Sequence, residues 1–460
     1  MAKQPSQEKL GFEYEVDDTP QSVTAYGGLP LVFETMRALG VSDAVRSQLR
    51  IGKNRREHDE VAMVESFVAL MASGGDCLDD MRVLMEDEAL AKLVGRSFPS
   101  PETARRFLYA FHDDEKIAAA AQNSTLKGVI PEETEPLQAL ARVNRHLVHA
   151  FAARRPPSRA TIDADATIHE SAKREAKAHY QGSRGYQPMV AIWAEQDVAV
   201  ADQFRDGNVT ASTGVLEFVQ KAFAALPTTV TERRFRGDTA FYNRGLLKWL
   251  LDERIEFTVG AKITQEIRQR LERWADSTAW TPFEDRGDEQ VDLLDHVPWS
   301  PNGLEAEEGL RFIALRFQPK QRDLINEESR FIMVVTNRKG PATELVRWHW
   351  QKAGTIEFLH DVVKNELGAG VLPCGRFGAN AAWCRLALLT YNVLSALKSI
   401  ALPPELHDAR PKRLRFQVFV VPAVIVNHAR KLWARVSNRL SRAQRLATAR
   451  ASLWSTLAVA

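Results

Sequence analysis

Apolar residues recur at intervals of three and four over the first third of the chain, the spacing of helices buried on one side. The pattern is clearest at Leu31, Val32, Met36 and Leu39, and again at Val61, Val64, Phe67, Val68, Leu70 and Met71. It predicts an all-helical N-terminal domain over residues 29–155, which we interpret as DNA-binding for the reasons given below. The polar residues 1–28 before it are expected to be a disordered leader.

The pattern changes after the double proline Pro156-Pro157, which ends the helical region and marks a domain boundary. Strands are then expected at residues 160–168, 186–194, 198–204, 228–236 and 255–261, and helices at 214–226 and 241–251. Three consecutive strands followed by alternating helices and strands are typical of an α/β domain with a mixed sheet. The connection lengths favour an antiparallel meander followed by parallel crossovers.

Short β-prone runs among charged loops then indicate a β-rich insertion, after which the helical pattern returns. An amphipathic helix is expected over residues 355–367, and a nearly apolar, buried helix over residues 379–400. The predicted boundaries are 156–261 and 347–400 for the α/β domain, 262–346 for the insertion, and 401–460 for a basic C-terminal helical region.

Composition narrows the class of protein. A chain of 460 residues is too long for one core, and its hydrophobic (45%) and charged (26%) fractions are those of a globular protein with two or three domains. The three scattered cysteines fit neither a zinc site nor a disulfide framework. No apolar stretch is long enough to span a bilayer, so we expect no membrane partner and a cytoplasmic location.

Positive charge is concentrated at the C-terminal end. The net charge is only +2, yet no Asp or Glu follows Asp408, whereas eleven Lys and Arg residues do. A segment of one sign favours a polyanionic partner, nucleic acid first. The alternative is a solvated helical face that is balanced by acids elsewhere in the fold.

A second basic feature lies in the N-terminal domain. Ser100-Pro101-Glu102 has the residues of a helix start, and the helix after it carries Arg105 and Arg106 beside apolar residues. These arginines are candidate DNA contacts, as on the recognition helix of a helix-turn-helix. An ordinary amphipathic helix with basic solvent-facing residues has the same pattern.

Candidate chemistry begins in the stretch from Thr161 to Ile168, where carboxylates alternate with small or β-branched residues. Because side chains alternate along a strand, Asp163 and Asp165 point to the same face. Two acids on one strand face are costly unless they hold a cation or lie at an exposed end.

Two more acids occupy suitable positions. Asp238 follows a β-prone run, and ligands of open α/β sheets collect at the carboxyl ends of strands; the alternative is a simple helix N-cap. Glu357 lies on the amphipathic helix, with Lys352 five residues before it and Lys364 two helical turns after it. A carboxylate flanked by lysines can hold a divalent ion while the lysines contact phosphates, although Glu and Lys also share many exposed helix faces.

Together the acids form a recognisable order: Asp165 on the first strand, Asp238 after a fourth strand, and Glu357 on a late helix beyond an insertion. This order resembles the ribonuclease-H-like DDE transposases, and more narrowly the bacterial insertion-sequence transposases of the insertion sequence thirteen-eighty group. Asp165-Ala166-Thr167 matches the family's Asp-x-Thr, which favours Asp165 over Asp163 as the first acid. Arg236-Gly237-Asp238-Thr239-Ala240-Phe241 matches Arg-x-Asp-Ser-x-Phe, with Thr in the Ser place.

The last motif of the family has a Tyr, an Arg, the Glu and a Lys along one helix, and the match here is incomplete. Glu357 and Lys364 are present, but Trp350 stands in the tyrosine place and Ala353 in the arginine place. Lys352 and Arg347 are the nearest cations that could take over the phosphate contacts of the missing arginine. Asp163 is left over, as a supporting residue behind the ligands or as an exposed neighbour.

The resemblance covers about residues 29–446. It implies an α/β fold: a ribonuclease-H-like mixed-sheet catalytic domain with a β-rich insertion, preceded by an all-helical domain and followed by basic helices. It also implies a DNA transposase that cleaves transposon ends and joins them to target DNA. Two Mg²⁺ ions about 4 Å apart, replaceable by Mn²⁺, would be held by Asp165, Asp238 and Glu357, with Asp165 bridging them.

The expected partners are double-stranded DNA, as terminal inverted repeats and as target, and a second copy of the chain on paired DNA ends. The expected location is the bacterial cytoplasm, at the nucleoid. Two alternatives stay open. One is a DNA nuclease of the same fold that performs no strand transfer. The other is an inactive descendant that only binds DNA, against which the presence of all three acids argues.

Overall fold

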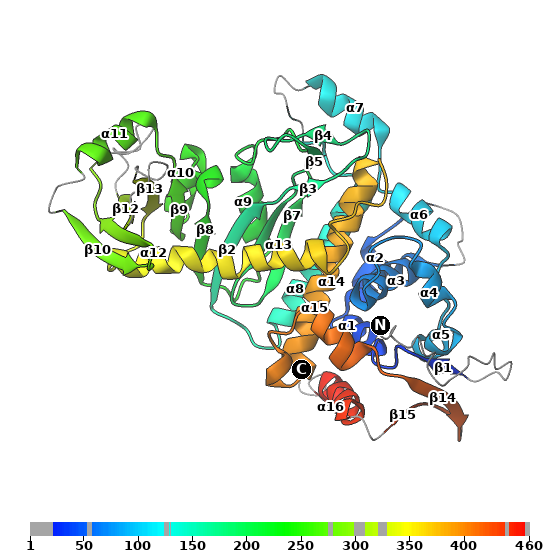
Figure 1. Ribbon diagram of the computed structural model, residues 1–460. Helices are drawn as coiled ribbons and strands as arrows, with labels where there is room; N and C mark the ends of the chain where they lie inside the picture. The colour runs from blue at the N-terminus through cyan, green and yellow to red at the C-terminus, as the bar shows by residue number, and fades with distance from the viewer. Residues whose placement is uncertain are drawn as a thin grey trace, which may run out of the picture.

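The computed structural model describes residues 22–52, 58–123, 128, 130–274, 279–298, 309–320, 329–437 and 441–455. A mixed sheet organises the molecule, with the N-terminal helices at one end and the insertion at the other (Figure 1). In the described part of the chain this sheet has nine strands, in the order β10-β11-β12-β13-β9-β8-β2-β6-β7.

The helices of the N-terminal region are α1 (Pro30–Ala38), α2 (Val41–Gln48), α3 (Glu60–Ser73), α4 (Met81–Met85), α5 (Glu88–Val94), α6 (Pro101–Tyr109), α7 (Asp114–Asn123) and α8 (Glu135–Ala152). The sequence predicted helices here, and their ends follow local chemistry. Asp59, Ser100 and Thr134 cap α3, α6 and α8 by accepting hydrogen bonds from backbone N–H groups of the first turn. Gly74 ends α3 in the left-handed conformation, with φ of 107°.

Five strands form the centre of the sheet: β2 (Arg159–Ala166), β6 (Met189–Trp193), β7 (Val198–Gln203), β8 (Glu232–Gly237) and β9 (Glu256–Ala261). The strands β2, β6 and β7 pair antiparallel, whereas β8 pairs parallel with both β2 and β9. The crossovers contain α9 (Val215–Ala224) and α10 (Arg244–Asp252). The predicted meander followed by parallel crossovers is therefore confirmed. Between β2 and β6 the chain adds a small sheet of β3 (His169–Glu170), β4 (Lys177–Ala178) and β5 (Arg184–Tyr186).

The insertion continues the same sheet. It contains α11 (Gln265–Arg273), β10 (Trp280–Asp285), β11 (Glu289–Leu294), β12 (Arg311–Pro319) and β13 (Arg330–Thr336). Since β13 pairs antiparallel with β9, the backbone hydrogen bonds run from the central strands into the insertion without a break. A small apolar core joins β11 and β12 to α12 (Ala342–Trp350), so the expected boundary at residues 346 and 347 falls inside a helix.

Two helices after the insertion hold the halves of the molecule together. The short 3₁₀ segment η3 (Gln351–Gly354) links α12 to α13 (Ile356–Asn365), and this run crosses the sheet from the insertion toward α14 (Figure 1). The helix α14 (Phe377–Ala401) is buried along residues 381–398, as its apolar sequence predicted. It packs against α3, α8 and β7, so the N-terminal helices share one continuous core with the sheet.

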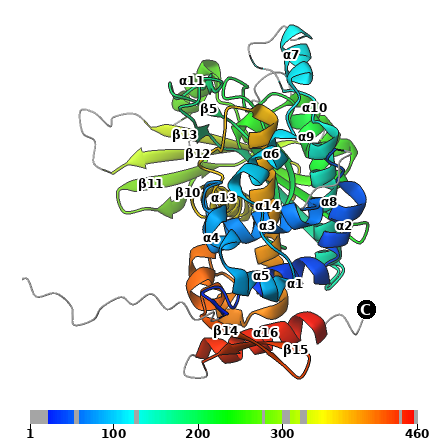
Figure 2. The same ribbon diagram turned by 90° about the vertical axis from the view of Figure 1, so that its right-hand side faces the viewer.

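The C-terminal region differs in part from the expected helices. It contains η4 (Pro404–Leu406), α15 (Pro411–Leu414), the π-helical turn η5 (Arg415–Phe419), the strands β14 (Ala423–His428) and β15 (Lys431–Val436), and α16 (Ser441–Ser455). The hairpin β14–β15 pairs with β1 (Val23–Thr24), so the end of the expected leader is part of a sheet; residues 1–21 lie outside the described residues. Figure 2 shows the hairpin and α16 together at the lower end of the molecule.

Helix propensity and positive charge are present along much of this region, which explains why the sequence predicted helices throughout it. The strands form because Val424, Ile425 and Val426 are β-branched, and because β1 and α5 supply a pairing edge and an apolar surface. In the sequence, β1 lies about 400 residues before the hairpin and α5 about 330 residues before it. In the described residues, no helix is long and apolar enough to cross a membrane.

Candidate active site

Asp165 and Asp238 lie next to each other at the carboxyl ends of two parallel strands. In the register of β2 and β8, Ala164 pairs with Gly237, and each acid is the residue that follows. Asp238 also caps η1 (Thr239–Phe241) by accepting a hydrogen bond of 3.0 Å from the backbone N–H of Ala240. The N-cap alternative is therefore correct as well, and it orients the carboxylate.

The two carboxylates repel each other. Burial raises the pKa of Asp238 above its ordinary value, and the nearby charge of Asp165 raises this pKa further. A pair of close, half-buried carboxylates is a site with excess negative charge, which a cation stabilises. Close packing holds the second acid in place: a Cβ at Gly260 of β9 would lie 2.9 Å from the backbone nitrogen of Thr239.

Lys352 supplies a positive charge at this place. Its side chain is buried, and its Nζ lies 3.5 Å from Oδ2 of Asp165. The ammonium also counteracts the pKa increase of Asp238, so it faces both acids. Lys352 lies in η3, which brings the chain back from the insertion directly over the ends of β2 and β8.

Glu357 is in the first turn of α13, with an exposed side chain. No hydrogen bond or ion pair of this carboxylate is found among the described residues. Its direction follows from its helix neighbours three and seven residues on, which share its side of α13. His360 hydrogen-bonds the backbone of Asp165, and Nζ of Lys364 donates to the carbonyl of Ile168 at 3.0 Å. Glu357 therefore lies on the side of α13 that is turned toward the end of β2.

The carboxylate oxygens of Asp165, Asp238 and Glu357 do not all lie within 4.8 Å of one another. Within the described ranges, the only three ligand groups that all lie within 4.8 Å of one another are Asp76, Cys77 and Asp80, at the C-terminal side of α3. A site for two ions about 4 Å apart spreads its ligands over a longer distance. Hard carboxylate oxygens and mutual repulsion between Asp165 and Asp238 fit Mg²⁺, and Asp165, Asp238 and Glu357 are the residues that would hold it.

Asp163 has a clear role, which the sequence did not reveal. Its carboxylate is fully buried and forms two hydrogen bonds with Arg236, at 2.6 Å from Nε and 2.7 Å from Nη2. Thr355 donates a hydrogen bond to the same carboxylate. Arg236 also donates to the carbonyl of Trp348 at 2.7 Å. We call Asp163, Arg236 and Thr355 the buried cluster.

The buried cluster joins the three segments that carry the acids. Asp165 follows Asp163 by two residues on β2, Asp238 follows Arg236 by two residues on β8, and Glu357 follows Thr355 by two residues at the start of α13. Each acid is thus attached by a short piece of backbone to one member of a single hydrogen-bonded unit. A polar residue two positions before each acid is the signal that sequence reasoning could have used.

His360 is a second residue that sequence reasoning missed. It is buried, and burial lowers its pKa to about 4, so the imidazole is neutral at physiological pH. Since it hydrogen-bonds the backbone of Asp165, it fixes the rotation of α13 relative to β2.

Other predicted contacts lie away from the carboxylates. Arg347 sits over the ring of Phe283 in the insertion, 5.4 Å from its centroid, and Trp350 packs against the same ring. The residue in the tyrosine place therefore anchors the insertion. Arg105 and Arg106 are exposed on α6, where both pair with Glu102.

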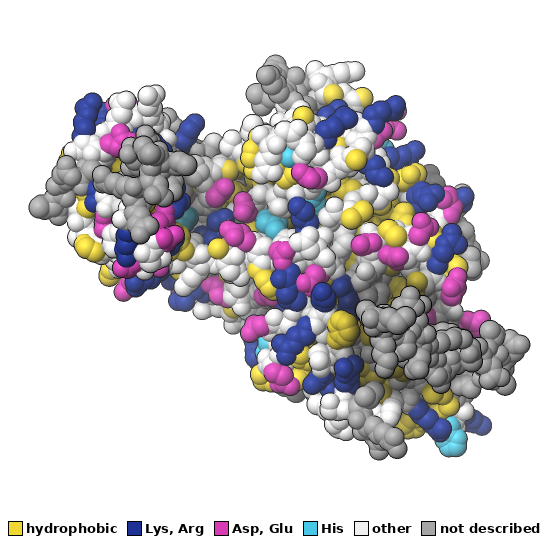
Figure 3. All heavy atoms as spheres, in the orientation of Figure 1, with side chains coloured by type: hydrophobic (Ala, Val, Ile, Leu, Met, Phe, Trp, Pro, Cys, Tyr) yellow, Lys and Arg dark blue, Asp and Glu magenta, His cyan; other side chains and the backbone are white. Residues whose placement is uncertain are grey.

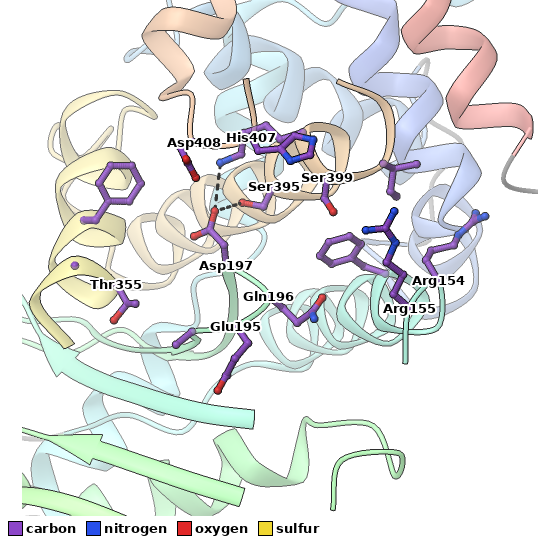
Figure 4. A pocket seen from close by; sticks show the side chains of 16 residues that line it. Arg154, Arg155, Glu195, Gln196, Asp197, Thr355, Ser395, Ser399, His407 and Asp408 are labelled. Atoms are coloured by element: carbon purple, nitrogen blue, oxygen red, sulfur yellow. Dashed lines mark hydrogen bonds and ion pairs between the residues drawn. The ribbon is translucent and has the colours of Figure 1, made fainter. Parts of the chain in front are cut away.

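A cavity of about 710 Å³ lies at the opposite end of β2, between the β6–β7 turn and α14 (Figure 4). None of the three acids is among its lining residues. Asp197 points into it and accepts hydrogen bonds from Ser395 at 3.0 Å and Lys398 at 3.2 Å. Thr355 also lines this cavity, so the cavity reaches one member of the buried cluster.

Two adjacent carboxylates at the ends of parallel strands, with a third on a covering helix, are an arrangement that can hold divalent ions for phosphoryl transfer. The comparison with protein families agrees with this class. The model described as "Transposase DDE domain group 1" matches residues 9–457, and the chain therefore belongs to this DDE transposase family.

Two further comparisons are less informative. A search of curated proteins found no match. Among solved structures, a cryo-EM structure of the piggyBac transposase synaptic complex with hairpin DNA is similar with 12% sequence identity and a TM-score of 0.46. The similarity covers 85% of this chain and 78% of that chain. It is too distant to carry an argument of its own.

Proposed function

We propose that this protein is a DNA transposase that cleaves the ends of a mobile element and joins the freed 3′-hydroxyls to target DNA. The observation that carries the proposal is the meeting of Asp165 and Asp238 at adjacent strand ends, with Glu357 on the helix that the buried cluster ties to both. The narrower assignment to bacterial elements of the insertion sequence thirteen-eighty group rests on the sequence motifs. Such an enzyme would act on DNA at the nucleoid, in the cytoplasm.

In this proposal the acidic residues bind metal ions and the basic residues bind DNA. Asp165, Asp238 and Glu357 would hold the divalent ions, whose chemistry would be to activate the attacking hydroxyl or water and to stabilise the leaving oxygen. The acids do not have to reorganise at the moment of reaction, because the buried cluster and His360 already orient their backbones. Glu357, exposed and without a partner among the described residues, has the freedom to turn toward an ion.

Lysines and arginines position the DNA. Lys352 presents its ammonium beside Asp165 and takes the phosphate contact of the arginine that Ala353 replaces. Lys364 uses one hydrogen for the carbonyl of Ile168, which leaves two for a phosphate oxygen. Arg105 and Arg106 pair with Glu102 only at the surface, where such pairs are weak, so they are available to duplex DNA. Arg347, on α12 beside Phe283 of the insertion, is a further candidate for a phosphate contact.

The decisive experiment uses a labelled duplex that carries the terminal repeat flanking the gene, with a supercoiled plasmid as target. The wild-type protein should nick the repeat end in Mg²⁺ or Mn²⁺, but not in EDTA, and should then join pre-cut ends to the plasmid. Asp165→Asn, Asp238→Ala and Glu357→Gln should lose both products by at least about a thousandfold. The exposed Glu344→Gln on α12 is the matched control and should retain both.

The products separate the alternatives. Cleavage without any joined product identifies a nuclease of the same fold. DNA binding without metal-dependent cleavage identifies an inactive binding protein. Cleavage that persists in Asp238→Ala contradicts the proposed acids. Sedimentation of the complex with paired ends tests the expected homodimer, since a single chain per pair of ends contradicts it.

A further inference from the structure

The hairpin β14–β15 presents one face to its own protein and another to solvent. Along the inner face, Ala423 and Ile425 are buried against Ala89 of α5. Every second residue of each strand points to the other side, because successive side chains point to opposite sides of a sheet. The register pairs His428 with Lys431, Val426 with Trp433 and Val424 with Arg435, so these six residues form the outer face of the hairpin.

The outer face combines positive charge with an exposed ring. Lys431, Trp433 and Arg435 occupy alternate positions on β15, and about half of the Trp433 side chain (51%) is accessible to solvent. The turn at Ala429 and Arg430 has positive φ at both residues, 50° and 61°, as in a tight two-residue hairpin. It places one more cation at the tip.

These cations have no internal partners in the part of the chain that the structure describes, unlike several other cations of the basic C-terminal segment. Arg410 pairs with Asp361 and Glu366, and Arg450 pairs with Glu34. Arg415 donates to the carbonyls of Met71 and Ala72 at the end of α3. Part of the positive charge therefore stabilises the fold, whereas the charge on the hairpin is directed to solvent.

The hairpin also has an unpaired strand edge. The strand order is β1-β14-β15, so the outer edge of β15 has no neighbour in the described residues. In Figure 1 the hairpin projects from the body at the end far from the insertion, and Figure 3 shows Lys, Arg and His side chains gathered there. An exposed edge with a large apolar ring invites self-association, but two copies of this face would bring like charges together.

From this arrangement we infer that the outer face of the hairpin docks on duplex DNA, outside the candidate active site. Lys431 and Arg435 are four residues apart, about 13 Å along an extended strand. The major groove of B-DNA is about 12 Å wide and admits a two-stranded ribbon, so the cations can reach phosphates while Trp433 contacts sugars or thymine methyl groups. The inference rests on the proposed function, because it takes DNA as the substrate.

The test measures binding of the full-length protein to a fluorescein-labelled 30-base-pair duplex by anisotropy, in EDTA and over a range of salt concentrations. Lys431→Gln with Arg435→Gln should weaken binding at least about tenfold and reduce the slope of log K against log salt by about 2, since two phosphate contacts are lost. Trp433→Ala should weaken binding about tenfold and leave the slope unchanged.

Matched variants control for misfolding. Lys431→Arg with Arg435→Lys keeps both charges, and Trp433→Phe keeps an aromatic ring, so both should bind within about threefold of the wild type. Unchanged affinity and slope in the glutamine and alanine variants would overturn the inference. So would a Trp433→Ala variant that turns a DNA-free dimer into a monomer while DNA binding is retained, because the face is then a contact between copies.

Cleavage separates this inference from the proposed function. If the wild type cleaves repeat-bearing DNA in Mg²⁺ but the hairpin variants bind normally, only the docking face is wrong. If the hairpin variants lose binding while Asp238→Ala cleaves like the wild type, the docking face stands and the proposed acids fail. A wild-type protein that does not bind the duplex overturns both.

Discussion

Asp163 and Arg236 form a two-point ion pair between adjacent parallel strands, with 0% and 3% of their side chains exposed. Asp165 follows Asp163 by two residues on β2, and Asp238 follows Arg236 by two residues on β8. The ion pair therefore lies just before both candidate catalytic acids along their strands. Thr355 donates a hydrogen bond to Asp163 and so connects the segment that carries Glu357 to this ion pair. An ion pair in this position determines the relative placement of carboxylates that repel each other.

Arg236→Met is expected to lower the free energy of unfolding by about 3–5 kcal/mol, because it leaves the carboxylate of Asp163 buried without its partner. Urea denaturation measures the loss. Arg142→Met on α8 is the matched control: Arg142 pairs with Glu135 at the surface, and the change there should stay below about 1 kcal/mol.

Replacing both partners distinguishes stability from positioning. Asp163→Leu with Arg236→Met should recover most of the stability, since two apolar groups pack without a buried charge. Metal-dependent cleavage should stay impaired, because the hydrogen bonds by which the buried cluster connects β2 and β8 to the start of α13 are then lost. A double variant with full cleavage would show that the ion pair contributes only to folding.

Asp238→Asn is expected to inactivate the protein and yet stabilise its metal-free form at neutral pH. Burial and the charge of Asp165 raise the pKa of Asp238 above its ordinary value of 3.8, so the ionised carboxylate destabilises the folded state at neutral pH. This cost diminishes as the pH falls through the raised pKa toward 3.8. The stabilisation should be on the order of 1 kcal/mol at pH 7 and should vanish near pH 4.

Asp285, in the insertion, provides a control for which the expected change in stability has the opposite sign. Lys320 hydrogen-bonds Asp285 and lowers its pKa, so ionised Asp285 stabilises the folded state. Asp285→Asn should therefore destabilise the protein slightly at pH 7, and this effect should vanish as the pH falls. If Asp238→Asn behaves like Asp285→Asn, then Asp238 does not experience the repulsion of Asp165.

Lys352→Met is expected to make the protein depend on divalent metal for its stability. Removing an ammonium 3.5 Å from Asp165 leaves two half-buried acids without their nearest cation, at a cost of about 1–3 kcal/mol. Thermal unfolding in EDTA should show this loss, and Mg²⁺ should restore more stability in Lys352→Met than in the wild type. Asp165→Asn is the reference, in which Mg²⁺ should have little effect. An equal Mg²⁺ response in all three proteins contradicts a metal site at this position.

Arg385 of α14 should make the fold sensitive to acid. It is buried and pairs with Glu133, just before α8, and with Asp202 of β7. Burial alone raises the pKa of Glu133, but the charge and hydrogen bonds of Arg385 outweigh it and lower this pKa to about 2. The stability from this pair is complete above about pH 4.5, the ordinary value, and is lost as the pH falls from there to about 2.

Glu133→Gln should remove about 1–3 kcal/mol at pH 7 and flatten the decline of stability below pH 4.5. Chemical denaturation at a series of pH values provides the measurement. Glu135→Gln, two residues further along the chain, removes a surface partner of Arg142 and should leave the pH profile as in the wild type. Parallel profiles for Glu133→Gln and the wild type contradict the role of Arg385.

The C-terminal region shows where local sequence is insufficient. Its basic residues and helical segments suggested helices throughout, but the hairpin forms because β1 and α5 offer an edge and an apolar surface. Those partners come from the opposite end of the sequence. No spacing rule within residues 401–460 contains them.

Up to about residue 400 the sequence by itself determined most of the order of helices and strands, because the periodicity of apolar side chains depends only on residues close together in the chain. It also placed Asp165 on the first strand, Asp238 after a later strand and Glu357 on a helix, since each motif is short and contiguous. The tertiary structure decided what Asp163, Arg236, His360 and Lys352 do. Their partners are between 73 and 195 residues away, and hydrogen bonds and charge depend on distance in space, which only the packed sheet and its covering helix establish.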